Sequence, residues 1–301
     1  MQLFFFELLV GGCTKGAQPN YKPIWGGGPP KLDEPPISEL SELPPCSAIR
    51  PKDSPQPPCF EPKGDPDSKQ RALVIGNDKY DYKPLRNPAN DARGITEQLV
   101  NMGFYVTRAH NLDKQNMDKV ISDFGERLSD IEVALFYYSG HGAQVEGKNF
   151  LVPTNNHNIK TAEDLKQNAV SAQTILAMME KENNGMNLLI LDACRDNPYQ
   201  GSDKNLTRGL KRIEPPMGAL VALAAAEGEP ALDGDGYYGL YTKHLLKALQ
   251  NAKTKRLDDV FMDVYNSVLT ASEGKQRPWY QVSMRKPFCV GNVGIVECPK
   301  Q

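Results

Sequence analysis

The sequence predicts an α/β protein in which a mainly parallel central sheet is sandwiched by helices. Short, nearly all-apolar runs recur within 71–77 and 104–109 and in the first parts of 133–142 and 187–196. Such runs are typical of strands that are buried on both faces of a parallel sheet. Between several of these runs, apolar residues recur at helical spacing. Alternation of strands and helices favours right-handed crossovers, and therefore parallel strands.

The first half of the predicted sheet alternates strand with helix. The strand at 71–77 ends in Gly-Asn, and the helix that follows is stopped at Gly103. The strand at 104–109 precedes an amphipathic helix over 117–128. The next strand begins V-A-L-F-Y-Y at 133 and then passes abruptly into S-G-H-G.

The second half continues the same pattern with a polar interruption after the fourth strand. A small hairpin is expected over 144–153, and Ser171 is a good cap for the helix that follows it. The fourth strand ends in L-D-A-C-R-D, and a polar stretch separates it from the next apolar run. The remaining expected elements are a strand at 221–226 and helices at 238–249 and 257–269.

Composition divides the chain into one folded domain and its terminal segments. Residues 1–13 are predicted to be a lipoprotein signal, and residues 14–68 a disordered tether that holds 14 of the 24 prolines. A segment so rich in proline and so poor in long apolar groups cannot bury enough surface to fold. The folded domain is expected over 69–290, with a tail at 291–301. The net charge of −2 argues against a nucleic-acid partner.

The amino terminus predicts export. An apolar run is followed by Val10-Gly11-Gly12-Cys13, which resembles the lipobox at which bacterial lipoproteins are cleaved and acylated on cysteine. We therefore expect a lipidated Cys13 and a periplasmic or membrane-anchored protein. Glu7 interrupts the apolar run and no Lys or Arg precedes it, so a cytoplasmic location is the alternative.

Two motifs carry the chemistry, and each lies where a buried strand ends. His141 follows one apolar run and Cys194 follows another, 53 residues later. In open α/β sheets, chemistry collects outside the carboxyl ends of the strands. If the two strands are neighbours, the imidazole can activate the thiol. The backbone amides of Gly142 and Cys194 would then donate to an oxyanion.

The motifs Y-Y-S-G-H-G and L-D-A-C-R-D resemble those of the caspase-like cysteine peptidases, most closely the prokaryotic metacaspase-like branch, often called orthocaspases. The resemblance covers about Arg71 to Val290. It implies that His141 is the general base and Cys194 the nucleophile of an endopeptidase. The D-A-C-R-D motif stands where animal caspases show Q-A-C-R-G, which argues against cleavage after Asp. The alternative function is a caspase-fold scaffold that binds partners without catalysis.

The resemblance also implies a preference for cleavage after Arg or Lys. In metacaspases the aspartates that match Asp91 and Asp192 line the primary specificity pocket, and two carboxylates attract a guanidinium. The alternative for Asp91 is a helix cap. Basic residues in the polar stretch after the nucleophile are candidate self-cleavage sites, and these residues are Lys204, Arg208, Lys211 and Arg212.

We expect no required cofactor. The acidic loop 233–236 lacks the ordered oxygen ligands of a calcium site, although the resemblance keeps stimulation by calcium as a prediction. The four histidines show no zinc-site spacing. Four cysteines outside the motifs form two local pairs, Cys46 with Cys59 and Cys289 with Cys298, whose disulfide state the sequence leaves open. By resemblance, the protein is expected to be a monomer that acts on protein or peptide substrates.

Overall fold

The structure is a computed structural model that describes most of the chain beyond residue 58. For Cys59 and Cys194 it describes the backbone. Lys204, Arg208, Cys13 and residues 14–58 of the predicted tether therefore lie outside the described residues. The described residues are 59–194, 210–227, 229, 231–232, 234, 236–291 and 293–299.

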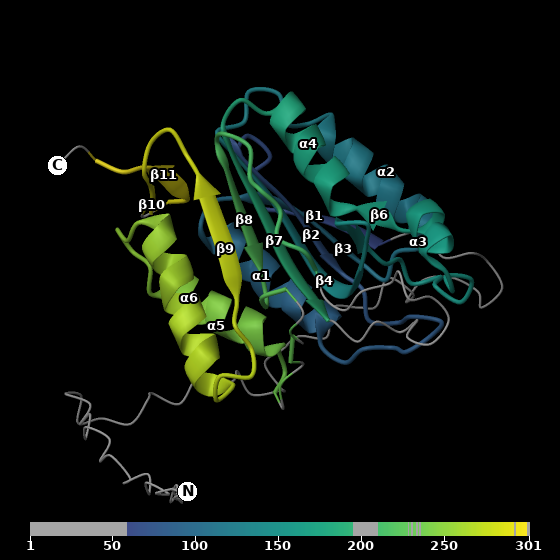
Figure 1. Ribbon diagram of the computed structural model, residues 1–301. Coiled ribbons are helices and arrows are strands. Elements are labelled where there is room, and N and C mark those ends of the chain that lie inside the picture. The colour runs from purple at the N-terminus through teal and green to yellow at the C-terminus, as the bar shows by residue number, and fades with distance from the viewer. Residues whose placement is uncertain are drawn as a thin grey trace, which may run out of the picture. The chain divides into compact units, whose positions relative to one another are not determined.

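A mixed sheet forms the centre of the described domain (Figure 1). Its strand order is β1-β3-β2-β4-β7-β8-β9, and the five central strands of this order run parallel. The two edge strands, β1 and β9, pair antiparallel to their neighbours. The strands of this path are β1 (Cys59–Lys63), β2 (Gln70–Gly76), β3 (Tyr105–His110), β4 (Val133–Val145), β7 (Met186–Cys194), β8 (Ala219–Leu223) and β9 (Trp279–Ser283).

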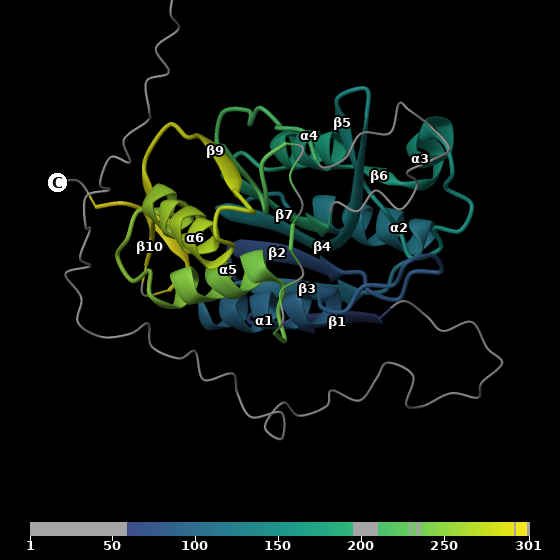
Figure 2. The ribbon, with the colours of Figure 1, turned by 60° about the horizontal axis from the view of Figure 1, so that its bottom comes forward.

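Helices cover both faces of the sheet, which confirms the predicted fold class (Figures 1 and 2). One face packs against α1, α5 and α6, and the other against α2 and α4. The side chain of Ser171 caps α4, as predicted. The helices are α1 (Pro88–Asn101), α2 (Lys114–Gly125), α3 (Ala162–Asn168), α4 (Ala172–Glu182), α5 (Leu240–Gln250) and α6 (Leu257–Ala271).

Alternation along the central strands explains why both faces need a helical cover. In β4, Leu135 and Tyr137 point into the core beneath α1 and α5, whereas Phe136 and Tyr138 point into the core beneath α2 and α4. All four side chains are at most 3% exposed. Because side chains of a strand alternate between faces, this unbroken apolar run requires an apolar partner on each side.

The strand that carries His141 does not end at the S-G-H-G motif as the sequence predicts. It continues to Val145, and its last four residues pair antiparallel with β5 (Lys148–Leu151). A short strand, β6 (Val170–Ser171), extends this hairpin. The pairing with β5 supplies a second partner where β2 has already ended, so the backbone of β4 stays extended through the small residues.

Several elements were not predicted, because each is short or half-buried. The edge strand β1 lies inside the stretch predicted as a disordered tether, and its backbone pairs with β3 despite Pro62. An edge position tolerates a proline whose missing N–H faces away from the ladder. The other unpredicted elements are α3, which begins with a capping box at Thr161, the edge strand β9, and β10 (Phe288–Val290) with β11 (Ile295–Glu297).

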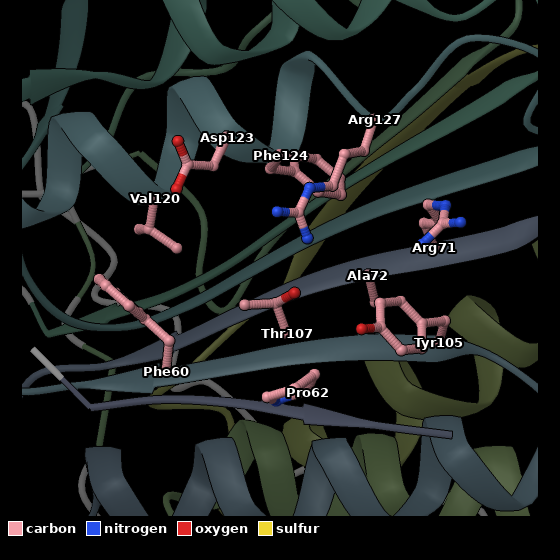
Figure 3. Close-up of a pocket in the computed structure, with 10 residues that line it drawn as sticks. All are labelled: Phe60, Pro62, Arg71, Ala72, Tyr105, Thr107, Val120, Asp123, Phe124 and Arg127. Atoms are coloured by element: carbon pink, nitrogen blue, oxygen red, sulfur yellow. The ribbon is translucent and has the colours of Figure 1, made fainter. Parts of the chain in front are cut away.

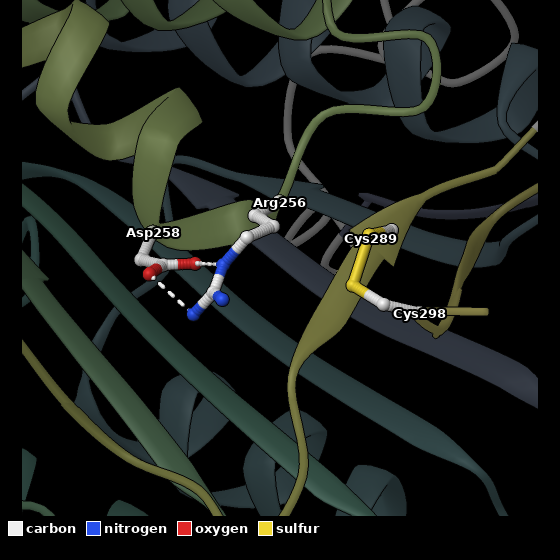
Figure 4. Close-up of a disulfide and its surroundings, with 4 residues drawn as sticks. All are labelled: Arg256, Asp258, Cys289 and Cys298. Carbon is white, nitrogen blue, oxygen red and sulfur yellow. Dashed lines mark hydrogen bonds and ion pairs between the residues drawn. A yellow bond between two sulfur atoms is a disulfide. The ribbon is translucent and has the colours of Figure 1, made fainter. Parts of the chain in front are cut away.

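The hairpin of β10 and β11 is closed by a disulfide between Cys289 and Cys298 (Figure 4). The backbone of Cys289 also forms a bridge to Arg256, just before α6. In β11, the backbone amide of Ile295 donates to the side chain of Gln70 at 2.9 Å. The residues predicted as a tail after 290 are therefore attached to the domain at two places.

Within the described part of the chain, no helix combines the length and the apolar character that a membrane span requires.

Candidate active site

The backbones of His141 and Cys194 lie side by side, because β4 and β7 are neighbours as predicted. The two strands run parallel, and their register pairs His141 with Cys194. Neighbouring strands are about 4.8 Å apart. The sheet therefore delivers the two predicted catalytic residues to one place at its carboxyl edge.

The Nε2 edge of the His141 imidazole contacts the loop that follows β2. Its Nε2 lies 2.6 Å from the carbonyl oxygen of Lys83. A carbonyl can only accept a hydrogen bond, so Nε2 carries the proton in this arrangement and Nδ1 carries the lone pair of the neutral ring. The ring is 1% exposed and packs on Tyr80, with 4.3 Å between ring centroids. In this tautomer, Nδ1 is the ring nitrogen that can accept a proton.

Gly142 lies close to the strand that carries Cys194. A side chain at Gly142 would begin 2.8 Å from the Ala193 Cβ and 3.0 Å from a methyl carbon of Leu210. The position therefore accepts only glycine without a rearrangement. The predicted oxyanion donors, the amides of Gly142 and Cys194, thus belong to paired strands at the same edge.

Asp91 and Asp192 converge although they come from different elements. Asp91 lies on α1, and its carboxylate accepts hydrogen bonds from the Ser139 hydroxyl at 2.9 Å and from the Gly239 amide at 2.8 Å. Asp192 lies on β7 and accepts from the Thr242 hydroxyl at 2.6 Å. Both side chains are buried. The structure thus brings together the two aspartates that were predicted to share a pocket.

Gly239 separates the two carboxylates. A methyl group at this position would lie 3.2 Å from one oxygen of Asp91 and 3.4 Å from one oxygen of Asp192. Gly239 is also the residue that precedes α5, so the positive end of that helix faces both carboxylates. Asp91 therefore accepts from the backbone amide at the start of α5, whereas its own helix begins after Asn87, whose side chain makes no capping hydrogen bond.

Burial and the negative charges of both carboxylates affect the pKa of one tyrosine, Tyr137. The pKa of Tyr137 is raised well above its usual value, first by burial and then by the negative charges of Asp91 and Asp192. Its hydroxyl lies 2.5 Å from that of Thr242, which donates to Asp192. Tyr137 therefore donates to Thr242, and Thr242 donates to the Asp192 carboxylate. The acidic pair lies in a region of low solvent access, where its charge acts strongly on neighbours.

The two self-cleavage candidates that the structure describes are held in place. The backbone N–H and C=O of Lys211 both bond to the side-chain amide of Asn149, each at 2.7 Å. Arg212 lies over the ring of Trp279, 6.0 Å from its centroid. Leu210 is 2% exposed. Cleavage after either candidate would require this stretch to leave its partners.

A separate pocket of about 240 Å³ lies between the β1 edge of the sheet and α2 (Figure 3). It contacts Arg71 and Tyr105 near the amino-terminal ends of β2 and β3, whereas His141 and Cys194 lie at carboxyl ends. It contributes no residue to the candidate active site. Among the described residues, no cluster of three or more His, Cys, Asp or Glu side chains could hold a metal ion.

Comparison with known families matches residues 69–289 to the caspase domain. The chain belongs to the caspase domain family. It is 28% identical over 227 residues to mucosa-associated lymphoid tissue lymphoma translocation protein 1 of Homo sapiens, a match that covers 71% of this chain and 27% of the human protein. The homologous protein of Mus musculus is 32% identical over 137 residues, which cover 45% of this chain and 16% of that protein.

These findings confirm the caspase-like family and its α/β fold. The caspase-family chain spans about a quarter or less of the length of these curated relatives. Both are mammalian proteins, so membership of the metacaspase-like branch stays a prediction.

Sequence reasoning missed the groups that support the predicted residues. Tyr138 and Ser139 belong to the Y-Y-S-G-H-G motif, so the sequence showed that they are close to His141. Tyr80, the Lys83 carbonyl and Thr242 come from other segments and carry no motif. Only the packing of the β2–α1 loop and of α5 against the sheet brings them to the site.

Proposed function

We propose that this caspase-family protein is a cysteine endopeptidase that uses His141 and Cys194. The observation that carries the proposal is the register of β4 and β7, which pairs these two residues at the carboxyl edge of the sheet. The hydrogen bond from Nε2 to the Lys83 carbonyl supports it, because that bond leaves Nδ1 as the basic nitrogen.

In the proposed reaction, Nδ1 of His141 accepts the thiol proton of Cys194 and the sulfur attacks the carbonyl carbon of the substrate. The carbonyl electrons move to oxygen, where the amides of Gly142 and Cys194 donate hydrogen bonds. The C–N bond then breaks as the imidazolium returns its proton to the amine, which leaves a thioester. Water attacks the thioester, gives its proton to His141, and releases the carboxylic acid and the thiol.

We propose that the substrate residue before the cleaved bond is Arg or Lys. Two buried carboxylates converge around Gly239, at the amino-terminal end of α5. Each ionised carboxylate has about four lone-pair positions, and carboxylates can bind a guanidinium through two parallel hydrogen bonds. An acidic substrate side chain would be repelled by the same charges.

The experiment that tests the activity is hydrolysis of fluorogenic peptides that end in Arg, Lys or Asp, with the full chain. The wild type should cleave the Arg and Lys peptides. Cys194→Ala should abolish cleavage, and His141→Ala should reduce it by roughly 10²–10⁴-fold, the usual contribution of a general base. Near-native rates in either variant would exclude this pair of catalytic residues. A folded wild type that cleaves nothing and does not react with a peptide electrophile would favour a scaffold function.

Self-processing, calcium stimulation and export remain proposals. We propose self-cleavage in the stretch after Cys194, and we propose that this reaction needs no cofactor. Comparing its rate with and without calcium tests whether calcium stimulates it. We also propose a monomeric lipoprotein with an acylated Cys13. Mass spectrometry of the native amino terminus and sedimentation in solution test these last two points, and an unmodified Met1 in a cytosolic fraction would exclude the lipoprotein.

A further inference from the structure

The loop between β2 and α1 contacts His141 at its ring and at its backbone. Tyr80 of this loop packs its ring on the imidazole at an interplanar angle of 48°. The hydroxyl of the same side chain accepts a hydrogen bond from the backbone N–H of His141 at 2.7 Å. Tyr80 is 5% exposed, so both contacts are shielded from water. One side chain therefore fixes the ring face and the backbone amide together.

A second tyrosine completes the contact from the strand itself. The Tyr138 hydroxyl lies within hydrogen-bond distance of the backbone carbonyl oxygen of His141, at 2.9 Å, and of the Tyr80 hydroxyl, at 3.0 Å. The carbonyl of Val152 lies 2.9 Å from the same Tyr138 hydroxyl. The two tyrosine hydroxyls thus form a pair that bonds both polar backbone groups of His141.

The hydroxyl pair explains the glycine that precedes the histidine. A Cβ atom at Gly140 would lie 2.4 Å from the Tyr80 oxygen and 2.6 Å from the Tyr138 oxygen. Contacts under 3.0 Å are far inside van der Waals distance, and Gly140 also has a φ of +156°. The position is glycine because the two hydroxyls occupy the space that a side chain would need.

We propose that Tyr80 and Tyr138 are positioning residues for the catalytic histidine. Their hydroxyl pair sets the backbone of His141, and the Tyr80 ring sets the plane of the imidazole relative to β7. Neither tyrosine supplies a proton to the reaction. The inference rests on the proposed peptidase function and deepens it. Catalytic groups must be held within about 0.5 Å and 10–20° of the productive geometry, and a displacement of about 1 Å can cost about 10²-fold in rate.

The test uses Tyr80→Phe and Tyr138→Phe in the full chain. Each variant keeps the aromatic ring and removes one hydroxyl that bonds the backbone of His141. The matched control is Tyr241→Phe, which removes a buried hydroxyl from α5 that has no hydrogen-bond partner among the described residues. Turnover, KM and the ¹⁵N resonances of the His141 ring are measured, the latter because they report which nitrogen is protonated.

We expect each test variant to lower kcat by about 10- to 100-fold with little change in KM, and to shift the His141 ring resonances. The control should change neither. Wild-type kcat with unshifted resonances in both variants, or an equal loss in Tyr241→Phe, would overturn the inference. If the wild type has no peptidase activity, the proposed function fails, and the ring resonances alone then decide whether the tyrosines position His141.

Discussion

Thr242 connects the acidic pair to the body of the domain. Its hydroxyl donates to Asp192 and lies within hydrogen-bond distance of Tyr137, and its side chain is fully buried. Asp91 is held in a different way, by a hydroxyl of β4 and by the amide that precedes α5. Each carboxylate is therefore oriented by groups that cannot move without disturbing the sheet or α5. A pair held in this way would be preorganised for the basic substrate residue that we propose.

Asp192→Asn tests this pair, because the amide has nearly the same shape and no charge. Hydrogen bonds to charged groups contribute about 1.5–3 kcal/mol, so kcat/KM for an Arg peptide should fall roughly 10- to 100-fold. Asp123→Asn, which removes a partly exposed carboxylate from α2, is the control and should leave the rate unchanged. The measurement is kcat/KM on matched Arg and Asp peptides. An unchanged preference for Arg in Asp192→Asn would contradict a substrate role for this carboxylate.

The convergence of the two aspartates could be predicted only in part from the sequence. Asp192 lies two residues before the nucleophile, and strand alternation places it on the same face as Leu188 and Ile190, beneath α1 and α5. Its partner Thr242 is 50 residues away in an ordinary helical pattern. The sequence around Thr242 carries no motif, because this residue reaches Asp192 only when α5 packs against the sheet.

At the scale of elements, long apolar runs were predictable and short edge elements were not. The five central parallel strands all had apolar sequences that the periodicity identified. The edge strand β1 contains Cys-Phe-Glu-Pro-Lys and lies in a proline-rich context, so its sequence resembles the linker that precedes it. Its pairing with β3 depends on a partner strand, and local propensity carries no record of that partner.

The disulfide of the β10–β11 hairpin gives a prediction about this element. Closing a loop of about ten residues restricts the unfolded chain by roughly 2–3 kcal/mol. Cys298→Ser should therefore lower the free energy of unfolding by about that amount, measured by denaturant titration. Dithiothreitol should destabilise the wild type and leave Cys298→Ser unaffected. Equal stability of the wild type with and without reductant would show that Cys289 and Cys298 are not bonded in solution.

Helix α5 carries a second prediction, which concerns pH. The pKa of His244 is lowered, first by burial and then by the charges of Lys243 and Lys247. A histidine with a lowered folded-state pKa binds protons more readily when unfolded, so its contribution to stability is complete above about pH 6.5 and is lost as the pH falls through its folded-state pKa.

The measurement is the thermal midpoint of the wild type and of His244→Gln at pH 7.5 and pH 5.5. The variant should lose less on acidification than the wild type. His157→Gln, which removes an exposed imidazole paired with Asp81, is the control and should behave like the wild type, since exposed ion pairs contribute little. An identical loss in all three proteins would show that His244 does not contribute to acid sensitivity.

At the scale of the whole domain, the segments before and after the proposed self-cleavage stretch both contribute strands to the central sheet. Before the stretch lie β2, β4 and β7, and after it lie β8, β9, α5 and α6. β7 and β8 pair along five residues of each strand, and one apolar core combines side chains from α1, β4, α5 and α6. Asn149 on the first part also holds the backbone of Lys211 on the second.

This arrangement predicts that self-cleavage separates the chain covalently and leaves the domain assembled. Because Lys211 and Arg212 are held by Asn149 and Trp279, we expect cleavage after Lys204 or Arg208. The double variant Lys204→Ala/Arg208→Ala should stay intact in a denaturing gel, as should Cys194→Ala. The matched control Lys211→Ala/Arg212→Ala should be cleaved like the wild type.

The cleaved wild type should elute from a sizing column as one species, and its two fragments should separate only under denaturing conditions. The reason is physical: the β7–β8 ladder and the shared apolar core are made by residues on both sides of the cleaved stretch, and these stay buried without a covalent link. Dissociation of the fragments in native buffer would contradict this account of the domain. Cleavage in the Lys204→Ala/Arg208→Ala variant would instead show that the stretch beginning at Leu210 leaves its partners during the reaction.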